Sequence, residues 1–278
     1  MLIEASPRDD VFGANDPAWL SEEALDAHPS FASTLGHGLG VLGCFSGVRP
    51  SLGNKDIADQ LGLSKPTVSR LTFTLVALGY LRKDAETGKY QLGPAVLSLG
   101  YPLLSQLTLR QVASNEMLEL SRLAQGPVSV GARDRMQVVY VETMDGGGTS
   151  ITKPGVGSTR PMLQTAMGRA LMAAHPEPTR SGLEKRLREK QPEQWAAYSV
   201  GLLNAYEDIR TLGFCTVVSE WRPTLAAVAV PMTVPLHGLH LAFNLTVPIF
   251  SDQAKVLREE YGPRLVELVR RVEAVLGF

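Results

Sequence analysis

The sequence predicts an α+β protein in which a mostly helical, winged helix-turn-helix region precedes a larger α+β domain with an antiparallel sheet. Three features predict this architecture. Two short amphipathic helical patterns lie on either side of Gly62, a strongly apolar stretch follows at residues 95–109, and strand and helix patterns are mixed from residue 110 to the end. With 278 residues, of which 44% are hydrophobic, the chain is long enough for two such domains.

Charge and pattern divide the chain into four segments. Residues 1–30 form an acidic N-terminal extension with seven acidic side chains and one basic side chain, and no function is assigned to it. Residues 31–94 form the predicted DNA-binding domain, where seven basic side chains exceed four acidic ones. Residues 95–109 form a linker helix, and residues 110–278 form the second domain. The excess of positive charge is therefore greatest where nucleic-acid binding requires it.

Helical spacing and capping residues define the DNA-binding domain. The first helix is expected to bury four residues, namely Leu35, Leu39, Leu42 and Phe45. The last helix is expected to bury an apolar stripe made of Val68, Leu71, Leu75 and Leu78. Ser64 stands at the N-cap of this last helix, Pro66 is tolerated in its first turn, and Gly79 ends it. Two helices joined by a turn at Gly62 are typical of a helix-turn-helix.

The opposite face of the last helix suits DNA recognition. Small hydroxyl side chains allow close approach, and a guanidinium can pair with guanine or contact a phosphate. No acidic residue occurs between Asp59 and Asp84, so nothing there repels the phosphate backbone. The predicted DNA-binding residues of this helix are Ser64, Lys65, Pro66, Thr67, Ser69 and Arg70. The alternative is a helical hairpin inside some larger domain, with its cations merely solvated.

A short β-hairpin is expected directly after this helix. Residues 80–83 and 89–92 have strand patterns, and residues 84–88 form a turn. A hairpin in this position is a wing, and its cations Arg82, Lys83 and Lys89 are available for phosphate or minor-groove contacts. The alternative is an exposed hairpin with ordinary surface cations. The order of helix, helix-turn-helix and basic hairpin favours DNA binding.

The linker at residues 95–109 is apolar on nearly every face and contains Pro102, where a kink or break is expected. Such a helix requires a partner that covers it. The same segment of a second subunit is the expected partner, because two recognition helices then reach the two half-sites of an operator. The sequence therefore predicts a homodimer that binds double-stranded DNA.

The second domain mixes helices with antiparallel strands. Helices are expected at residues 110–125, 165–174, 184–190, 202–212 and 251–276, and strands at residues 128–132, 137–143, 149–152, 214–220, 225–231 and 239–246. Asn244 and Thr246 interrupt the last strand two residues apart, so both side chains point to the same face. Two hydrogen-bonding side chains among apolar neighbours indicate a small-ligand pocket, and the alternative is the solvent face of the sheet.

Neither an enzyme nor a metal site is expected. Cys44 and Cys215 stand far apart, and the loop histidines His237 and His240 lack an acidic or cysteine partner. His175 is expected to be exposed. No catalytic motif occurs, so no catalytic residue and no cofactor is assigned. The alternatives are a small-molecule hydrolase or isomerase at residues 110–278, or an architectural DNA binder. No signal peptide or membrane span is recognised, so a soluble, cytoplasmic protein without membrane contact is expected.

Several strings resemble the IclR family of bacterial transcriptional regulators. They are HGLGVLGCFSG, IADQLGLSKPTVSRLTFTLVALGYL, GKYQLGPAVLSLGY, QVVYVET and VGSTRPMLQTAMGRALMA, and the resemblance covers residues 35–275. The last string is similar to the family's effector-domain signature, V-G-x-x-x-P-x-x-x-T-x-x-G-[KR]-x-L-L-A. The strings look most like the branch that regulates protocatechuate and p-hydroxybenzoate catabolism. In this chain Pro102 breaks the branch's linker sequence, and Ala166 stands where the branch has serine.

The resemblance implies a GAF-like effector domain that binds a small organic ligand, and dimers that commonly pair into tetramers on operator DNA. By motif match, the effector pocket falls on Ala166, Met167, Cys215, Val217, Ala227, Asn244 and Thr246, with added apolar surface from Met162 and Leu163. Asn244 and Thr246 occupy positions where relatives have serine, so hydrogen bonding is kept. The apolar residues favour an aromatic or otherwise hydrophobic organic acid, or a related amide, as the effector.

Overall fold

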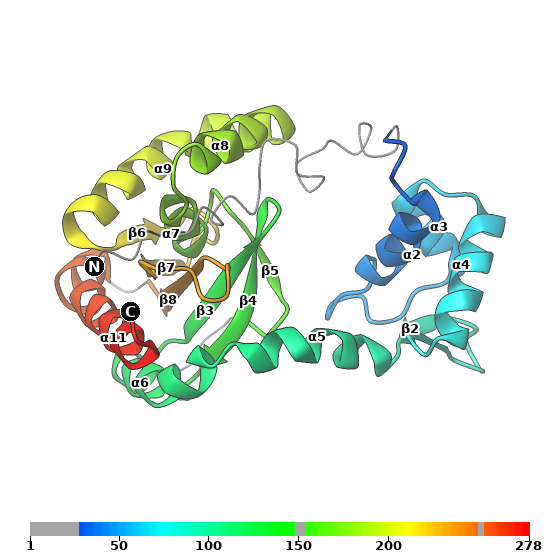
Figure 1. Cartoon of the computed structure of the whole chain (residues 1–278), viewed down its shortest axis with the longest axis horizontal. Coiled ribbons are helices and arrows are strands. Elements are labelled where there is room, and N and C mark those ends of the chain that lie inside the picture. Colours follow the sequence, from blue (N-terminus) through cyan, green and yellow to red (C-terminus); the bar gives the residue numbers. More distant parts are fainter. Residues whose placement is uncertain (1–27, 148–153, 250–252) are drawn as a thin grey trace, which may run out of the picture. The chain divides into compact units, whose positions relative to one another are not determined.

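The computed structural model describes residues 28–147, 154–249 and 253–278, and it separates into two compact units between Gln106 and Leu107 (Figure 1). Each unit is described by itself. The acidic extension before residue 28 lies outside the described residues, as do the strand expected at residues 149–152 and the expected start of the final helix at residue 251.

The first unit is a winged helix-turn-helix, as predicted. Its elements are α2 (Ser33–Gly43), α3 (Asn54–Leu61), α4 (Lys65–Ala77), β1 (Leu81–Lys83), β2 (Tyr90–Leu92) and α5 (Ala95–Gln106). Strands β1 and β2 pair antiparallel, with Leu81 opposite Leu92. Leu52 exchanges two backbone hydrogen bonds with Tyr90, at 3.0 and 2.8 Å, and so anchors the wing to the chain that precedes α3.

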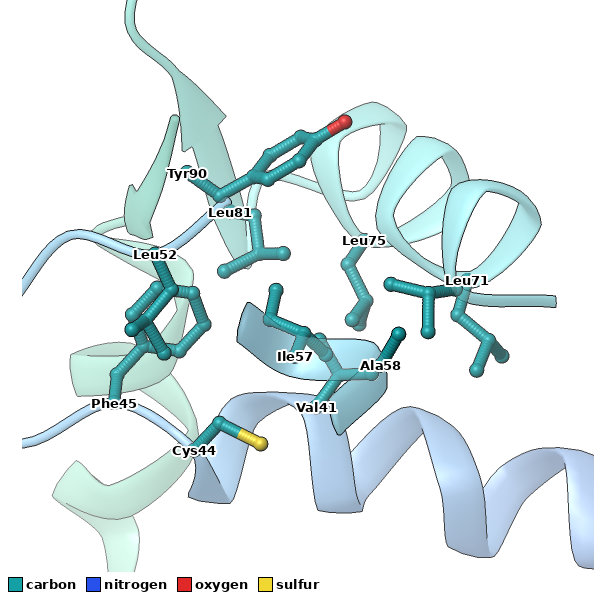
Figure 2. Packing of buried hydrophobic residues seen from close by; sticks show 11 residues of the cluster. Val41, Cys44, Phe45, Leu52, Ile57, Ala58, Leu71, Leu75, Leu81 and Tyr90 are labelled. Atoms are coloured by element: carbon teal, nitrogen blue, oxygen red, sulfur yellow. The ribbon is translucent and has the colours of Figure 1, made fainter. Parts of the chain in front are cut away.

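Figure 2 shows the buried core of this unit. It differs from the expected core at the start of α2 and at the end of α4. Leu35 and Leu39 of α2 are 63% and 55% exposed, whereas Val41 of α2 and the following Cys44 are buried. The prediction is confirmed for Phe45, which is buried, and Leu42 packs partly buried against the core. It is wrong for Leu35 and Leu39, because packing against α3 and α4 sets the rotation of this glycine-rich helix. Leu78 is 61% exposed because α4 ends at Ala77 and the stripe ends with it.

Helix α5 has no buried residue and continues through Pro102. The expected break falls instead at Leu107 and Thr108, after which α6 begins at Leu109. The exposed side chains of α5 include four large apolar ones, Leu97, Leu99, Tyr101 and Leu103.

The second unit is an α+β domain, as predicted, built on a six-stranded sheet in the order β5-β4-β3-β8-β7-β6 with every neighbouring pair antiparallel. The strands are β3 (Val128–Asp134), β4 (Gln137–Met144), β5 (Thr159–Pro161), β6 (Cys215–Val218), β7 (Leu225–Pro231) and β8 (Leu241–Pro248). The helices are α6 (Leu109–Ala124), α7 (Ala166–Ala174), α8 (Thr179–Lys190), α9 (Pro192–Leu212), α10 (Gln253–Val256), the π-helix η2 (Leu257–Tyr261) and α11 (Gly262–Leu276).

Helices cover both faces of the sheet. Helices α6 and α11 pack together on one face, and α7 lies on the other with α9 beside it (Figure 1). The central strand β8 is accordingly buried along most of its length on both faces. Several elements differ from expectation: β5 is too short for its periodicity to be recognised, and a π-helical turn interrupts the final helix. Helix α8 begins five residues earlier than residue 184, and α9 begins ten residues earlier than residue 202.

His175 is buried, at 6% exposure, although exposure was expected from its position beside Pro176. Its Nε2 accepts a hydrogen bond of 3.0 Å from Nε of Arg133, and its ring centroid lies 4.3 Å from that of His240. Burial, together with the positive charges of Arg133 and His240, lowers the pKa of His175 to about 3. The imidazole is therefore neutral in the folded protein.

We expect the second unit to lose stability as the pH falls below 6.5, the ordinary pKa of histidine. His175 is protonated near pH 6.5 in the unfolded chain but only near pH 3 in the folded protein. The stabilisation that comes from the neutral imidazole is therefore fully present above pH 6.5 and is lost as the pH falls from 6.5 to 3. One proton corresponds to at most about 1.4 kcal/mol per pH unit. The free energy of unfolding, measured with denaturant at several pH values, should depend less steeply on pH for His175→Gln than for the wild-type protein.

The exposed His237, in the same unit, provides the matched control for replacing a histidine by glutamine. His240 contributes with the same sign in all three proteins, because burial lowers its pKa as well. Identical slopes for wild type and His175→Gln would contradict the assignment.

Candidate DNA-binding surface and effector cleft

The local sequence fixes the start of α4. Gly62 adopts a left-handed conformation, with φ of 66°, and turns the chain between α3 and α4. Ser64 is the N-cap, since its Oγ accepts a hydrogen bond of 3.3 Å from the backbone N–H of Thr67. Pro66 lies in the first turn, where its missing N–H leaves no helical bond unmade. The turn and cap predicted from the sequence are both present.

The outward face of α4 carries the residues predicted to bind DNA. Val68, Leu71 and Leu75 are buried in the core, so the opposite side of the helix faces solvent. Lys65 and Arg70 are exposed on that side. The rest of this face is formed by small side chains and by the large apolar side chain of Phe73, which is 75% exposed. A cationic, sterically open helix face of this kind fits the major groove.

Hydrogen bonds divide these predicted residues into two groups. The hydroxyls of Ser64 and Thr67 lie 2.8 Å apart, and Ser69 Oγ accepts a hydrogen bond of 2.9 Å from Asn54 Nδ2. These hydroxyls therefore brace the helix start and link α4 to α3. Arg70 has no acidic partner among the residues that the structure describes, so its guanidinium is available for an external acceptor.

The wing presents its cations on an ordered hairpin. Arg82, Lys83 and Lys89 are all exposed, while Leu81 and Tyr90 anchor the two strands in the core. Asp84 orders the turn, because its Oδ1 accepts hydrogen bonds from the backbone N–H groups of Glu86 and Thr87 at 3.1 and 2.7 Å. These bonds hold the pKa of Asp84 below its ordinary value, with the Thr87 N–H as the main cause.

The second unit contains a cleft formed by curvature of its sheet. Strands β5 and β6 are the two edges of the sheet, yet the guanidinium carbon of Arg160 on β5 lies 4.7 Å from the ring centroid of Trp221, just beyond β6. The sheet must therefore curl so that its edges approach one another. The empty space in the cleft, together with the open solvent in front of it, amounts to about 480 Å³.

The N-terminal end of α7 contributes to one wall of this cleft. Thr165 caps the helix, since its Oγ1 accepts a hydrogen bond of 3.1 Å from the Gly168 N–H and donates one of 2.8 Å to the Pro161 carbonyl. Gln164, Thr165 and Ala166 all line the cleft. The partial positive charge of a helix N-terminus favours an anionic group nearby.

A buried ion pair supports the loop that carries Trp221. Arg169 of α7 is 2% exposed. Its Nη1 donates a hydrogen bond of 3.0 Å to the Glu220 carboxylate, and its Nη2 contacts the same carboxylate. Its Nε donates a hydrogen bond of 2.8 Å to the Leu163 carbonyl. Helix α9 packs closely over this guanidinium at Gly201, where an added Cβ would lie 2.6 Å from Arg169 Nη2.

Five of the nine residues predicted for effector binding line the cleft, namely Ala166, Val217, Ala227, Asn244 and Thr246. The same-face prediction for Asn244 and Thr246 is confirmed, because Asn244 Nδ2 donates a hydrogen bond of 2.9 Å to Thr246 Oγ1. The other four, Met162, Leu163, Met167 and Cys215, are buried at 0–1% exposure and do not line the cleft. Their backbone and side chains pack behind its walls.

Sequence reasoning missed the aromatic and cationic part of the cleft. Tyr140, Arg160, Trp221 and Arg222 all line it. Arg160 lies within the signature string, so its charge was a signal that could have been used. Trp221 and Arg222 lie in a loop without periodicity, and only the curvature of the sheet brings them to the cleft.

The cysteine in this region is not activated. Burial raises the pKa of the Cys215 thiol to about 12, and the thiol contacts the Ala166 carbonyl at 3.5 Å. It therefore stays protonated at neutral pH, whereas a nucleophilic cysteine requires a lowered pKa. Across residues 28–147, 154–249 and 253–278, no three side chains of His, Cys, Asp or Glu gather as a metal site would require. No helix in the same ranges has both the length and the apolar character to cross a membrane.

Comparison with known proteins identifies relatives of both units. The description "IclR helix-turn-helix domain" matches residues 34–85, and "Bacterial transcriptional regulator IclR C-terminal" matches residues 102–274. The chain is 30% identical to the HTH-type transcriptional regulator TsaQ1/TsaQ2 of Comamonas testosteroni, over 91% of each chain.

Solved structures share the fold along nearly the whole chain. An IclR family transcriptional regulator from Brucella abortus is 40% identical with a TM-score of 0.81, covering 93% of this chain and 97% of that one. An IclR homolog from Microbacterium hydrocarbonoxydans, complexed with 4-hydroxybenzoate, is 20% identical with a TM-score of 0.68, covering 87% of this chain and 98% of that one. The second likeness is one of fold alone.

Proposed function

Because the chain belongs to the IclR family of bacterial transcriptional regulators, we propose that it controls a catabolic operon in response to a small aromatic or otherwise hydrophobic organic acid, or a related amide. Within the family, we place it nearest the branch that regulates protocatechuate and p-hydroxybenzoate catabolism. The observation that carries the effector class is the cleft, which combines Trp221 and Tyr140 with Arg160, Arg222 and small apolar walls.

The first unit reads double-stranded operator DNA. Helix α4 enters the major groove, with Lys65 and Arg70 as its cationic contacts, and the wing residues Arg82, Lys83 and Lys89 contact the phosphate backbone. The exposed apolar side chains of α5 support a homodimer in which α5 packs against its counterpart, and pairing of dimers gives a tetramer.

The cleft supports an aromatic acid as the effector. Its apolar lining suits a ring, and its two arginines and the α7 N-terminus suit a carboxylate. A protein of the same fold, the Microbacterium homolog, holds 4-hydroxybenzoate, so this fold accommodates a ligand of that class.

Regulation follows from linkage between the two sites. An effector changes operator binding only if it binds the DNA-competent and DNA-incompetent forms of the dimer with different affinities. Related chains are named as transcriptional regulators, and burial keeps the Cys215 thiol protonated. Both observations favour a regulator over the hydrolase or isomerase alternative.

Arg70→Ala is expected to weaken operator binding by roughly 1–3 kcal/mol, because a guanidinium that reads a base edge contributes about that much. The operator is first selected from a random DNA library with the purified protein, and affinity is then measured by fluorescence anisotropy at fixed salt. Arg188→Ala serves as the matched control, since Arg188 stacks over Trp195 in the second unit at 5.0 Å from the ring centroid. Equal affinities for the two variants would remove Arg70 from DNA recognition.

A further inference from the structure

The open side of the cleft carries paired cations. Arg160 and Arg222 both lie over the Trp221 ring, with guanidinium carbons 4.7 and 4.8 Å from its centroid. Arg222 is exposed, and Arg160 and Trp221 are half-buried, so these groups lie at the solvent side. This contact joins the β5 edge of the sheet to the loop after β6 and forms the mouth of the cleft.

The positive charge of the mouth is not neutralised by the protein. Neither Arg160 nor Arg222 has an acidic partner among the described residues, and the described lining of the cleft contains no Asp or Glu. Arg160 Nη1 donates a hydrogen bond of 2.7 Å to the Thr159 carbonyl. Two partly exposed guanidinium groups with spare donors are suited to a carboxylate, which accepts paired hydrogen bonds.

The floor of the cleft has a different chemistry. Asn244 lies on the central strand β8 and is 4% exposed. Its Nδ2 donates to Thr246 Oγ1, but its Oδ1 is buried and has no hydrogen-bond partner among the described residues. A buried acceptor without a partner is costly, so a ligand that supplies a donor at this point gains affinity.

The walls between mouth and floor are small and apolar. Ala166 comes from the start of α7, while Val217 and Ala227 face each other as register partners on β6 and β7. The side chains of these walls are short and carry no polar group. The cleft is therefore polar at both ends and apolar between them.

The geometry points to an effector of defined polarity: an aromatic carboxylate whose carboxylate binds Arg160 and Arg222 beside Trp221, and whose far side carries a hydroxyl or amino donor for Asn244 Oδ1. This inference rests on the proposal that the cleft is the effector site. It assigns a role to each end of the cleft and specifies the direction in which the ligand binds.

A ligand series tests the two ends separately, by calorimetric titration of the purified full-length protein. We expect 4-hydroxybenzoate to bind about fivefold more tightly than benzoate, 2-hydroxybenzoate or 4-methylbenzoate, because only its hydroxyl reaches the floor. Methyl 4-hydroxybenzoate, which lacks the charge, should bind more than about tenfold more weakly than the acid.

The failures are distinguishable. If 4-methylbenzoate binds as tightly as 4-hydroxybenzoate, or the ester as tightly as the acid, the two-ended arrangement is overturned while an aromatic effector site remains. If none of these compounds binds, the proposed aromatic effector is overturned together with the inference.

Variants assign each preference to its residues. Arg222→Gln should reduce the preference for acid over ester, since only Arg160 of the pair then remains, and Asn244→Leu should reverse the preference for hydroxyl over methyl. Arg188→Gln, which removes an arginine stacked on a tryptophan outside the cleft, should change neither ratio. Because each readout is a ratio of affinities within one protein, partial misfolding does not imitate it. Should Asn244→Leu fail to fold, the exposed Arg222 still provides a decisive test, and an unchanged acid-to-ester ratio there overturns the carboxylate site.

Discussion

Glu220→Ala is expected to lower the free energy of unfolding of the second unit by roughly 3 kcal/mol, because it leaves a buried guanidinium without its carboxylate. Arg169 is 2% exposed and makes two contacts with Glu220. The Glu220 side chain is 30% exposed, so water compensates in part and the value falls at the lower end of the range for broken buried pairs. For a unit of this size the midpoint of thermal unfolding should fall by about 6–12 °C.

The chain offers an exposed pair for comparison. Glu207 and Arg210 lie one helical turn apart on α9, with side chains 62% and 71% exposed. Glu207→Ala should therefore leave the midpoint of thermal unfolding nearly unchanged, because solvent screens an exposed pair. Replacing Arg169 and Glu220 together by leucine should recover part of the loss, because no buried charge then remains unpaired. Similar thermal shifts for Glu207→Ala and Glu220→Ala would contradict the assigned role of the buried pair.

The position of this ion pair connects the stability of the second unit to the shape of the cleft. Glu220 directly precedes Trp221 and Arg222, so its contact with Arg169 fixes the start of the loop that forms the mouth of the cleft. The residue before it, Ser219, has a φ of 62°, an uncommon conformation for a non-glycine residue. The same turn directs Glu220 inward and places Trp221 and Arg222 at the cleft.

The DNA-binding unit was largely predictable because its determinants are local. A cap at Ser64, a left-handed turn at Gly62 and an apolar stripe on α4 each depend on residues within a few positions of one another. The same reasoning failed for Leu35 and Leu39 of α2, because the rotation of this helix depends on packing with helices more distant in sequence. Its exposed Leu35 and Leu39 have the same spacing as a buried stripe, and periodicity alone does not distinguish the two cases.

The cleft was predictable only where a motif or strand period marked it. Asn244 and Thr246 were found because alternate residues of a strand share a face. The contact between Arg160 and Trp221 joins opposite edges of the sheet, so it follows from strand order and curvature and not from any local pattern. Likewise, Met162, Leu163, Met167 and Cys215 belong to the same sequence blocks as the lining residues, yet their side chains pack away from the cleft.

Gly168→Ala is expected to destabilise the second unit by about 3 kcal/mol and to disturb the wall that α7 contributes to the cleft. A Cβ on Gly168 would lie 2.1 Å from the carbonyl oxygen of Met162 and 2.6 Å from its carbonyl carbon. These are backbone atoms, so the overlap is relieved only if α7 moves away from the preceding turn, a form of overpacking that typically costs 1–3 kcal/mol or more. Such a movement also strains the hydrogen bond from the Gly168 N–H to Thr165 Oγ1.

Gly182 supplies the matched control, because it also lies within a helix, α8, and a Cβ there meets no atom within 4 Å. Gly182→Ala should raise stability by about 0.5–1 kcal/mol, since alanine restricts the unfolded chain and favours the helix. The two substitutions make the same chemical change, but they are expected to change the free energy of unfolding in opposite directions. Denaturant unfolding followed by tryptophan fluorescence measures both changes. If both variants are stabilised, the close approach of α7 to Met162 does not constrain this helix in the way that its geometry indicates.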